Sequence, residues 1–591
     1  MDLERLTDSG LLDREKADVG VSRERARLAR LSRLLLILSP VLAFLWWRIF
    51  SANPIKFPHL TPRMLGFLPL AALIVLLGAA LLIPMIASGR SPHVLFRPEE
   101  IDVGLDDVKG APVVVEEIVK SLNLFLAHKT FHDRMGGNPR RAMLFEGPPG
   151  TGKTYLAKAM AREAGVPFLF VSSSAFQSMF YGQTNKRIRS YFKALRAAAR
   201  REGGAIGFIE EIDAIGASRS GTGGSTQREG IAGVVNELLI QLQSFDTPPT
   251  SVRFRGAVIE LFNRLLPVSH RLAKPIAPRA HFLLIGATNR AADLDAALLR
   301  PGRFDRSIYF DLPSRAGRRE LFDYYLAKKA HAAELDESAR RDTLAAMTFG
   351  YSPVMIEHLL DEALVWALRR GHDRLSWDDV QRAKMTEEIG LAQPVDYTEA
   401  ERRTIATHES GHATVAWLVG GGRKLEVLSI IKRKDALGLL AHSEAEERYL
   451  KARSEMHALI QIALGGMVAE EIFFGETTSG ALSDLKVATS YAANMVGAMG
   501  MEGTLFSYEA IVSPHANLVA KLAASEGGQD RVEALLSGAR DEVREMLNRN
   551  RHVIEHLRDA LLERDELIGP EILEVINTAA AGDHPPMVTD R

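Results

Sequence analysis

The sequence contains no cysteine, which excludes disulfide bonds, thiol nucleophiles and zinc bound by thiolates. Histidine, aspartate and glutamate are therefore the only ordinary metal ligands in the chain. An excess of charge is also lacking, because 73 basic residues nearly balance 74 acidic ones and leave a net charge of −1. A near-neutral chain exerts no overall attraction on a polyanion, so we expect no nucleic-acid partner. Its length of 591 residues predicts several domains.

Two apolar runs lie near the N-terminus. Residues 64–87 carry no charge and are long enough to cross about 30 Å of hydrocarbon as a helix. Residues 34–50 form a weaker candidate, because Pro40 interrupts the run, although Trp46 and Trp47 suit a membrane interface. A cleaved signal peptide is the alternative, but the long charged lead-in and the lack of a small-residue cleavage site favour two transmembrane helices.

The charges that flank these runs predict their orientation. Segment 1–33 is cytoplasmic in this interpretation, and segment 51–63 is an extracytoplasmic loop too short to fold. Basic residues are more numerous outside the runs (Arg23, Arg25, Arg27, Arg30, Arg33, Arg90 and Arg97) than at the loop (Arg48, Lys56 and Arg63). This bias favours both ends in the cytoplasm. We therefore expect a multi-pass protein of the cell inner (cytoplasmic) membrane, with lipid as a partner.

A glycine-rich loop follows the apolar segment 141–146 and precedes a helical pattern over residues 154–164. Its residues are Gly147, Pro148, Pro149, Gly150, Thr151, Gly152, Lys153 and Thr154. Glycines let backbone N–H groups close around phosphates at a helix N-terminus. Lys153 is expected to reach the terminal phosphates and Thr154 to ligate magnesium. This strand–loop–helix order predicts a site for ATP and Mg²⁺.

Two further buried strands, residues 205–209 and 282–287, end in polar residues. Glu210 and Glu211 follow the first strand, and Asn289 follows the second. A carboxylate at a strand end can hold the magnesium shell, and the next one can polarise the attacking water, which an amide can also orient. We assign these roles to Glu210, Glu211 and Asn289 respectively.

Arg300 and Arg303 lie on a turn over residues 299–305. Arginines in such a position can stabilise transition-state charge on the ATP of a neighbouring subunit, which requires a ring. The residues alone leave open the alternative that both are ordinary surface arginines.

A second motif, His408-Glu409-Ser410-Gly411-His412, lies on a helix that Thr398 and Glu401 are expected to cap and that runs to about residue 419. Because His408 and His412 are four residues apart, they share one face and can bind one zinc ion. Glu409 would take a proton from metal-bound water and return it to the leaving amine. A third ligand is needed, and the sequence alone offers too many carboxylates to choose one.

Together these motifs resemble the FtsH family of membrane-anchored AAA+ zinc metalloproteases, peptidase family M41, over about residues 101–576. The resemblance implies a multidomain fold with two N-terminal transmembrane helices, an α/β P-loop AAA+ domain with a small helical lid, and a mostly α-helical zinc metallopeptidase domain. The expected boundaries are 101–312 for the ATPase core, 313–389 for the lid, 390–397 for a linker, 398–576 for the peptidase and 577–591 for a flexible tail. Linker character extends over residues 381–395, with Gly390 as a hinge.

The resemblance also assigns residues that the patterns alone do not. It places Asp107 and Val108 near the adenine, makes Asn289 a sensor and makes Arg300 and Arg303 the arginine fingers. Segment 179–182 corresponds to the family's pore loop, in which Phe180, followed by Tyr181, grips the substrate. In segment 478–489 it makes Asp484 the third zinc ligand, with Glu470 and Glu471 as supporting or structural carboxylates.

Three segments depart from the family pattern. Glu210 stands where aspartate is usual, so that the magnesium geometry must absorb an extra methylene, and nucleotide turnover is expected to be slower. Residues 247–280 are an insertion with the amphipathic stretch 258–266 and many basic residues: Arg253, Arg255, Arg264, Arg271, Lys274 and Arg279 against Glu260. It is either a solvated excursion or a surface that contacts substrate or an adaptor. Segment 351–354 replaces a small, acidic pattern near the sensor 2 position.

The sequence therefore predicts an ATP-dependent zinc endopeptidase that forms a homo-hexamer and unfolds, translocates and degrades membrane and cytoplasmic proteins. One alternative is a membrane-anchored unfoldase or chaperone with an inert peptidase half. A second alternative is a peptidase whose ATPase is crippled by Glu210. Intact zinc-site residues disfavour the first alternative, and intact Lys153, Glu211 and Asn289 disfavour the second.

Overall fold

The structure is a computed structural model, and it describes residues 18–51 and 92–581 except 138, 178–182, 217–224, 244–249, 266, 268–270, 274–279, 434–435, 445–447, 449 and 512–516. The expected second membrane run, residues 64–87, and the expected pore loop lie outside the described residues. The chain divides into two compact units. The first comprises the chain up to Lys329 together with Gly350–His358, and the second comprises Ala330–Phe349 and the chain from Leu359 onward.

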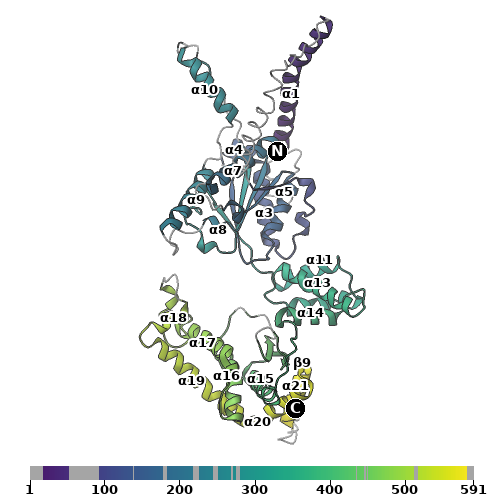
Figure 1. The fold of residues 1–591 in the computed structure, drawn as a ribbon, viewed down its shortest axis with the longest axis vertical. Coiled ribbons are helices and arrows are strands. Elements are labelled where there is room, and N and C mark those ends of the chain that lie inside the picture. The colour runs from purple at the N-terminus through teal and green to yellow at the C-terminus, as the bar shows by residue number, and fades with distance from the viewer. Residues whose placement is uncertain are drawn as a thin grey trace, which may run out of the picture. The chain divides into compact units, whose positions relative to one another are not determined.

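A six-stranded sheet forms the centre of the first unit (Figure 1). Its order is β1-β3-β4-β5-β2-β6, and all neighbours are parallel except the antiparallel pair β1 and β3. The strands are β1 (Val94–Phe96), β2 (Ala142–Glu146), β3 (Phe168–Ser172), β4 (Ala205–Glu210), β5 (Phe282–Thr288) and β6 (Arg306–Tyr309). Parallel strands are buried on both faces, which explains their continuous apolar runs.

Helices cover both faces of this sheet. Met143 and Phe145 of β2 pack with α3 and α5, whereas Ala142 and Leu144 of the same strand face α7 and α9. The helices of this unit are α1 (Asp18–Phe50), α3 (Pro112–Leu126), α4 (His128–Met135), α5 (Lys153–Ala164), α6 (Ser173–Phe176), α7 (Gln183–Glu202), α8 (Asp213–Gly216), α9 (Ser225–Gln243), α10 (Thr250–Leu265) and α11 (Arg315–Leu326). The result is a layered α/β domain in which β2, β4 and β5 end at the same edge, where ligands bind in such sheets.

The N-terminal helix α1 is docked on this domain at its first turn. Val19 is buried in the core beside α3, and the carboxylate of Asp18 accepts hydrogen bonds from the backbone N–H groups of Lys129 and Thr130 at 2.9 and 3.0 Å. The helix then continues without a break through Pro40 to Phe50. Residues 18–33, which precede the first apolar run, and that run are therefore parts of one helix.

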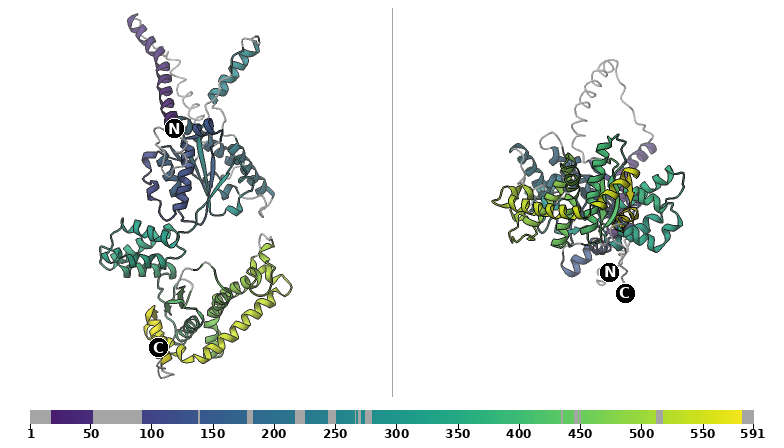
Figure 2. Two further views of the ribbon diagram at one scale, coloured as in Figure 1. Left: turned by 180° about the vertical axis from the view of Figure 1, so that it is seen from behind. Right: turned by 90° about the horizontal axis from the view of Figure 1, so that it is seen from below.

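The second unit holds a helical group followed by a further, mostly helical fold. α13 begins in the first unit and continues in the second. The helices are α12 (Ser338–Met347), α13 (Pro353–Arg369), α14 (Trp377–Ile389), α15 (Glu399–Val419), α16 (Arg453–Phe474), α17 (Leu482–Gly497), α18 (Leu518–Ala523), α19 (Gly528–Arg549), α20 (Arg551–Arg564) and α21 (Pro570–Ala581). Strands β7 (Lys424–Ser429), β8 (Leu439–Ser443) and β9 (Glu566–Ile568) form a small antiparallel sheet in the order β8-β7-β9. Figure 2 shows this helical majority from behind.

One expectation about the connection between domains is wrong. Residues 381–389, which have the composition of a linker, belong to α14, because Ser376 and Asp379 form a capping box that starts this helix and Gly390 ends it at a φ of 100°. An extended connection follows from Gly390 to Thr398. A glycine with positive φ is a common helix stop, so the hinge expected at Gly390 coincides with the end of a helix.

Among the described residues a single helix, α16, is long and apolar enough to cross a membrane, and 56% of its apolar window is buried inside the protein. It packs against α15, α17 and α19 within the second unit. A shorter apolar stretch, Leu38–Phe50, ends α1.

Candidate functional site

The two histidines of the second motif converge with the aspartate that the resemblance selected. His408 and His412 lie one turn apart on α15, and Asp484 lies in the first turn of α17. The distance between the two Nε2 atoms is 3.1 Å, and Asp484 Oδ2 lies 3.0 Å from His408 Nε2 and 3.5 Å from His412 Nε2. Ligands of a tetrahedral zinc lie about 2.0–2.1 Å from the metal and hence about 3.4 Å from one another. The spacing of the three atoms fits a zinc ion.

The other ring nitrogen of each histidine is held by α16. His408 Nδ1 bonds to the carboxylate of Glu470 at 2.7 Å, and His412 Nδ1 donates to the backbone carbonyl of Ile462 at 2.7 Å. These bonds leave both Nε2 atoms directed toward Asp484. Partners of this kind fix the tautomer and orientation of metal-binding imidazoles. Among the described residues, this is the one group of potential ligands that converges on a metal-sized space.

Glycines make room for this arrangement. A Cβ built on Gly466 would lie 2.4 Å from His408 Nε2 and 2.5 Å from His412 Nε2, so a side chain there would enter the space beside the metal ligands. α15 and α16 also cross closely, since a Cβ on Gly411 would meet the carbonyl oxygen of Gly465 at 2.5 Å. Gly466 was not among the expected site residues. Its signal in the sequence is a pair of glycines inside a helix, which is costly without a packing or functional reason.

His408 forms close ion pairs with Glu470 and Asp484. Burial disfavours the charged form of His408, but bonds to Asp484 and Glu470 outweigh it and raise the pKa of the imidazole to about 10. Burial acts against ionised Asp484 as well, and the two imidazoles nevertheless hold its pKa well below the usual range. A dication in this space would take the place of the proton on His408.

Glu409 is 6% exposed and lies beside the two ligands on α15. Burial raises the pKa of its carboxyl, while the two neighbouring imidazoles act in the opposite direction. A Cβ on Gly438, just before β8, would lie 2.6 Å from Glu409 Oε1, so the chain passes directly over this carboxylate. A buried carboxyl with a raised pKa suits a group that accepts and returns a proton.

The two supporting carboxylates expected on α16 have different surroundings. Glu470 accepts hydrogen bonds from the backbone N–H and hydroxyl of Thr478 in addition to its bond with His408. Glu471 instead pairs with Arg540 and Arg544 of α19. Glu470 therefore positions a metal ligand, whereas Glu471 joins two helices.

The glycine-rich loop connects β2 to α5 in the first unit. Lys153 Nζ donates to the carbonyl oxygens of Gly147 and Pro148 at 2.8 and 2.6 Å, which holds the ammonium group inside the loop. Gly147, Gly150 and Gly152 all have positive φ values. The loop has the backbone conformation that a phosphate cradle requires, with its lysine at the centre.

The acidic residues after β4 lie at this loop. Thr154 Oγ1 donates to Glu210 Oε1 at 2.8 Å, so the longer side chain at position 210 still reaches the threonine expected to share its magnesium ion. Glu211 has a φ of 52°, which is strained for a residue with a side chain and is often found at functional sites. Asn289 is exposed at the end of β5, whose Thr288 pairs in register with Glu146 of β2.

The other residues expected at the nucleotide site lie in different parts of the first unit. Asp107 accepts from the hydroxyl of Tyr324 at 2.9 Å, and Val108 packs at the edge of the core. Arg300 is exposed, whereas Arg303 is partly buried and donates to the carbonyl of Ala297. The structure does not bring these two arginines to the loop of the same chain through any contact among the described residues.

The segment that departs from the sensor 2 pattern lies against the phosphate loop. Val354 N donates to the carbonyl of Gly150 at 3.4 Å, and a Cβ on Gly150 would meet Ser352 Oγ at 2.7 Å. Tyr351 and Ser352 are both buried. The replacement therefore places a serine hydroxyl, rather than an acidic group, beside the glycine loop. Phe180 and Tyr181 lie outside the described residues.

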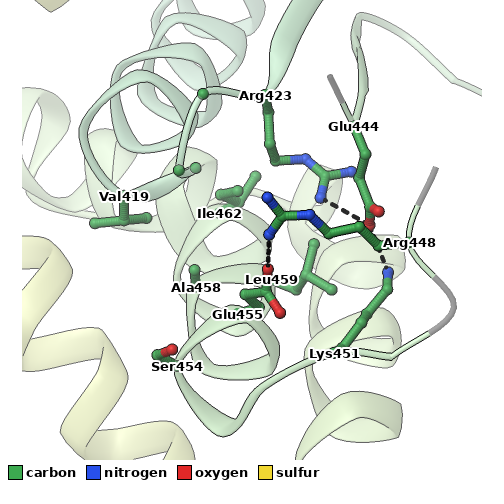
Figure 3. A pocket seen from close by; sticks show the side chains of 13 residues that line it. Val419, Arg423, Glu444, Arg448, Lys451, Ser454, Glu455, Ala458, Leu459 and Ile462 are labelled. Carbon is green, nitrogen blue, oxygen red and sulfur yellow. Dashed lines mark hydrogen bonds and ion pairs between the residues drawn. The ribbon is translucent and has the colours of Figure 1, made fainter. Parts of the chain in front are cut away.

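A separate cavity of about 420 Å³ opens at the C-terminal end of α15 (Figure 3). Leu459 and Ile462 line it, and Ile462 is the residue whose carbonyl holds His412. Its rim consists of paired charges, with Glu444 bonded to Arg423 at 3.4 Å and to Lys451 at 3.0 Å. The cavity thus shares a wall with the zinc site.

Comparisons with known proteins agree with the two sites. The model of the AAA family, "ATPase family associated with various cellular activities", matches residues 143–312, and that of peptidase family M41 matches residues 396–575. An ATP-dependent zinc metalloprotease FtsH of Methylibium petroleiphilum is 33% identical over 84% of this chain and 76% of its own length. Those of Syntrophobacter fumaroxidans (33%, over 89% and 75%) and Thermotoga maritima (31%, over 80% and 73%) are similarly related. With matches of this extent over both domains, the chain belongs to the FtsH family of ATP-dependent zinc metalloproteases.

Proposed function

We propose that this ATP-dependent zinc metalloprotease is a membrane-anchored endopeptidase that unfolds, translocates and degrades membrane and cytoplasmic proteins. The observation that carries the proposal is the convergence of His408 Nε2, His412 Nε2 and Asp484 Oδ2, with both Nδ1 atoms already bonded. This donor set lies in the same chain as a phosphate loop whose lysine is centred in the loop.

In the peptidase half, His408, His412 and Asp484 would hold the zinc. Bound zinc supplies Lewis acidity and lowers the pKa of a bound water to about 7. Glu409 accepts the proton of the attacking water and returns it to the leaving amine, for which its burial and raised pKa suit it. Glu470 holds the ring of His408 so that Nε2 faces the metal.

In the ATPase half, Lys153 binds the terminal phosphates of ATP, and Thr154 with Glu210 holds Mg²⁺. Their mutual distance of 2.8 Å is short enough for both oxygens to share one coordination shell. Glu211 polarises the attacking water, with Asn289 as the orienting amide. Gly147, Gly150, Thr151 and Gly152 supply backbone N–H groups, whereas Pro148 and Pro149, which have no N–H, shape the loop. Asp107 and Val108 lie toward the adenine.

A homo-hexameric ring is the assembly that gives Arg300 and Arg303 a role. Arg300 and Arg303 both reach the ATP of a neighbouring subunit as arginine fingers. Arg300 is exposed, and the bond of Arg303 to the carbonyl of Ala297 holds the turn that carries them. Phe180 and Tyr181 line the central pore and grip protein substrates, so that ATP hydrolysis moves the chain toward His408 and His412.

Two helices anchor the ring in the inner (cytoplasmic) membrane with both domains in the cytoplasm. The exposed apolar side chains of α1, including Trp46 and Trp47 at 58% and 65% exposure, support a first span over residues 34–50. Residues 64–87 provide the second. We place the domain boundaries at 101–312 for the core, 313–389 for the lid, 390–397 for the linker and 398–576 for the peptidase.

Degradation of casein by the purified full-length chain tests this proposal. Hydrolysis of casein should require both ATP and zinc, and a zinc chelator should abolish it while ATP hydrolysis continues. Asp484→Ala should abolish casein cleavage while ATP hydrolysis continues, as chelation does. Lys153→Ala should lose ATP hydrolysis and, with it, the degradation of folded substrates. ATP-dependent unfolding without cleavage in the presence of zinc would instead indicate the unfoldase alternative.

A further inference from the structure

The described residues of the insertion 247–280 form an arm on the ATPase domain. Its helix α10 (Thr250–Leu265) is followed by a returning segment at residues 271–273, and the side chain of Asn263 joins the two. Asn263 Nδ2 donates to the carbonyl of Leu272 at 2.9 Å, and its Oδ1 accepts from Leu272 N at 2.8 Å. These two bonds fix Leu272 beside the far half of the helix.

The far half of the arm exposes large apolar side chains. Leu261, Phe262 and Leu272 are 62%, 56% and 54% exposed, and we call these three residues the arm-tip patch. Leu261 and Phe262 are neighbours on α10, and the bonds of Asn263 hold Leu272 beside the same half of that helix. Single exposed apolar residues need no explanation, but three on one end of a protruding element indicate a surface that a membrane or another molecule covers.

The charge of the insertion identifies what covers the patch. Glu260 is the only acidic residue among residues 247–280, whereas the same segment contains six lysines and arginines, and Arg271 of the described part is exposed. Apolar residues combined with basic ones suit the headgroup region of an anionic membrane. A second copy of the chain would bring an equally basic arm, which like charge disfavours.

The position of the arm agrees with this occupant. In Figures 1 and 2, α10 and α1 rise from the same end of the ATPase domain. The 16 residues of α10 span about 24 Å, which is also the rise along α1 from Asp18 to Leu34, where the proposed first span begins. The root of α1 is fixed by Val19 and by the bonds of Asp18, so the height of its apolar half above the domain is set.

We propose that the arm-tip patch inserts into the headgroup region of the anionic leaflet that α1 enters, as an interfacial contact of the ATPase domain with lipid. The proposal rests on the membrane anchor proposed above. Because α10 emerges from a different part of the ATPase domain than α1, the arm would give each subunit a second point of support and limit the tilt of the domain against the membrane.

Site-directed spin labelling tests the proposal, and the absence of cysteine makes the labelling specific. Full-length Phe262→Cys is labelled and reconstituted into phosphatidylcholine vesicles with and without phosphatidylglycerol. Glu260→Cys, two residues away on the same helix, is the matched control. The label at position 262 should gain contact with lipid-soluble oxygen and lose contact with a water-soluble nickel chelate, more so with phosphatidylglycerol, whereas the label at position 260 should remain in water.

A label at position 262 that stays equally accessible to nickel in both vesicles would refute the proposal. So would shielding that appears only when a protein substrate is added, or only when subunits assemble in detergent, because these results identify a protein as the occupant. Extraction with alkaline carbonate measures the anchor separately. If carbonate extracts the chain from the vesicles, both the membrane anchor and this proposal are wrong. If the chain resists extraction but the label at position 262 remains in water, the anchor holds and the arm contact alone is wrong.

Discussion

Gly466→Ala is the substitution that tests the geometry of the zinc site most directly. Its new methyl group would lie 2.4 and 2.5 Å from the Nε2 atoms of His408 and His412. An ordinary carbon contact needs about 3.4 Å, so either the imidazoles or the helix must move by about 1 Å. Both rings are held at Nδ1 by bonds of 2.7 Å, to Glu470 and to the carbonyl of Ile462. The movement therefore breaks or bends the bonds that aim the ligands.

The expected loss of zinc affinity follows from what the hydrogen-bond partners of metal-binding histidines contribute. Disturbing the groups that orient a metal ligand typically weakens metal binding about 10- to 100-fold, which is about 1.4–2.8 kcal/mol. Replacement of glycine by alanine inside a helix acts in the opposite direction, because it favours the helix by about 1 kcal/mol. Zinc affinity and casein cleavage should thus fall without a loss of helix content, and ATP hydrolysis should persist.

Competition with a chromophoric zinc chelator measures the affinity. Gly538→Ala is the matched control, since Gly538 lies inside α19 of the same domain and a Cβ there meets nothing within 4 Å. This control should bind zinc like the parent chain and gain up to about 1 kcal/mol of stability. If Gly466→Ala binds zinc as tightly as the parent chain, the position of the metal inferred from the three ligand atoms is wrong.

Three further predictions concern individual carboxyl and imidazole groups. Glu409→Gln should retain zinc but lower the rate of casein cleavage by about 10²–10⁴-fold, because only the proton transfer is removed; normal turnover would contradict its role. Glu470→Gln should weaken zinc binding about 10- to 100-fold, measured by chelator competition, since it removes the carboxylate partner of His408. His128 is stacked on His281, and burial lowers the pKa of its imidazole to about 4. Between about pH 6.5 and pH 4, this histidine is therefore protonated in the unfolded chain but neutral in the folded ATPase domain. Stability should decline over that range by on the order of 1–3 kcal/mol, and thermal unfolding of His128→Gln should show a smaller decline than the parent chain.

Local sequence signals were sufficient for the elements that carry both motifs. The strand before the glycine loop was expected at residues 141–146 and is Ala142–Glu146, and the zinc-site helix begins at its capping box, with Thr398 accepting from Glu401 N. These elements follow from short-range patterns: an apolar run that ends in glycines, and side chains that satisfy the first N–H groups of a helix.

Elements that depend on distant residues were not predictable in this way. The sheet β8-β7-β9 pairs Leu428 with Leu567, far away in the sequence, and β9 has only three residues. The helix through Pro40 was likewise missed as a single element, since proline usually ends a helix and the docking of Val19 joins residues that no local pattern connects. Neither pairing nor docking leaves a local pattern.

The zinc site shows why its motif alone is an incomplete description. α15 contributes both histidines, but α16 decides where they point, through Ile462, Gly466 and Glu470. These residues are spaced four apart and so lie on one face of α16. The first binds one ring, the last binds the other, and the glycine between them leaves space beside both Nε2 atoms. Because a helix presents such a row only in one register, a shift of α16 by one residue would remove all three contacts together, and the two histidines would remain on α15 without a defined direction for the metal.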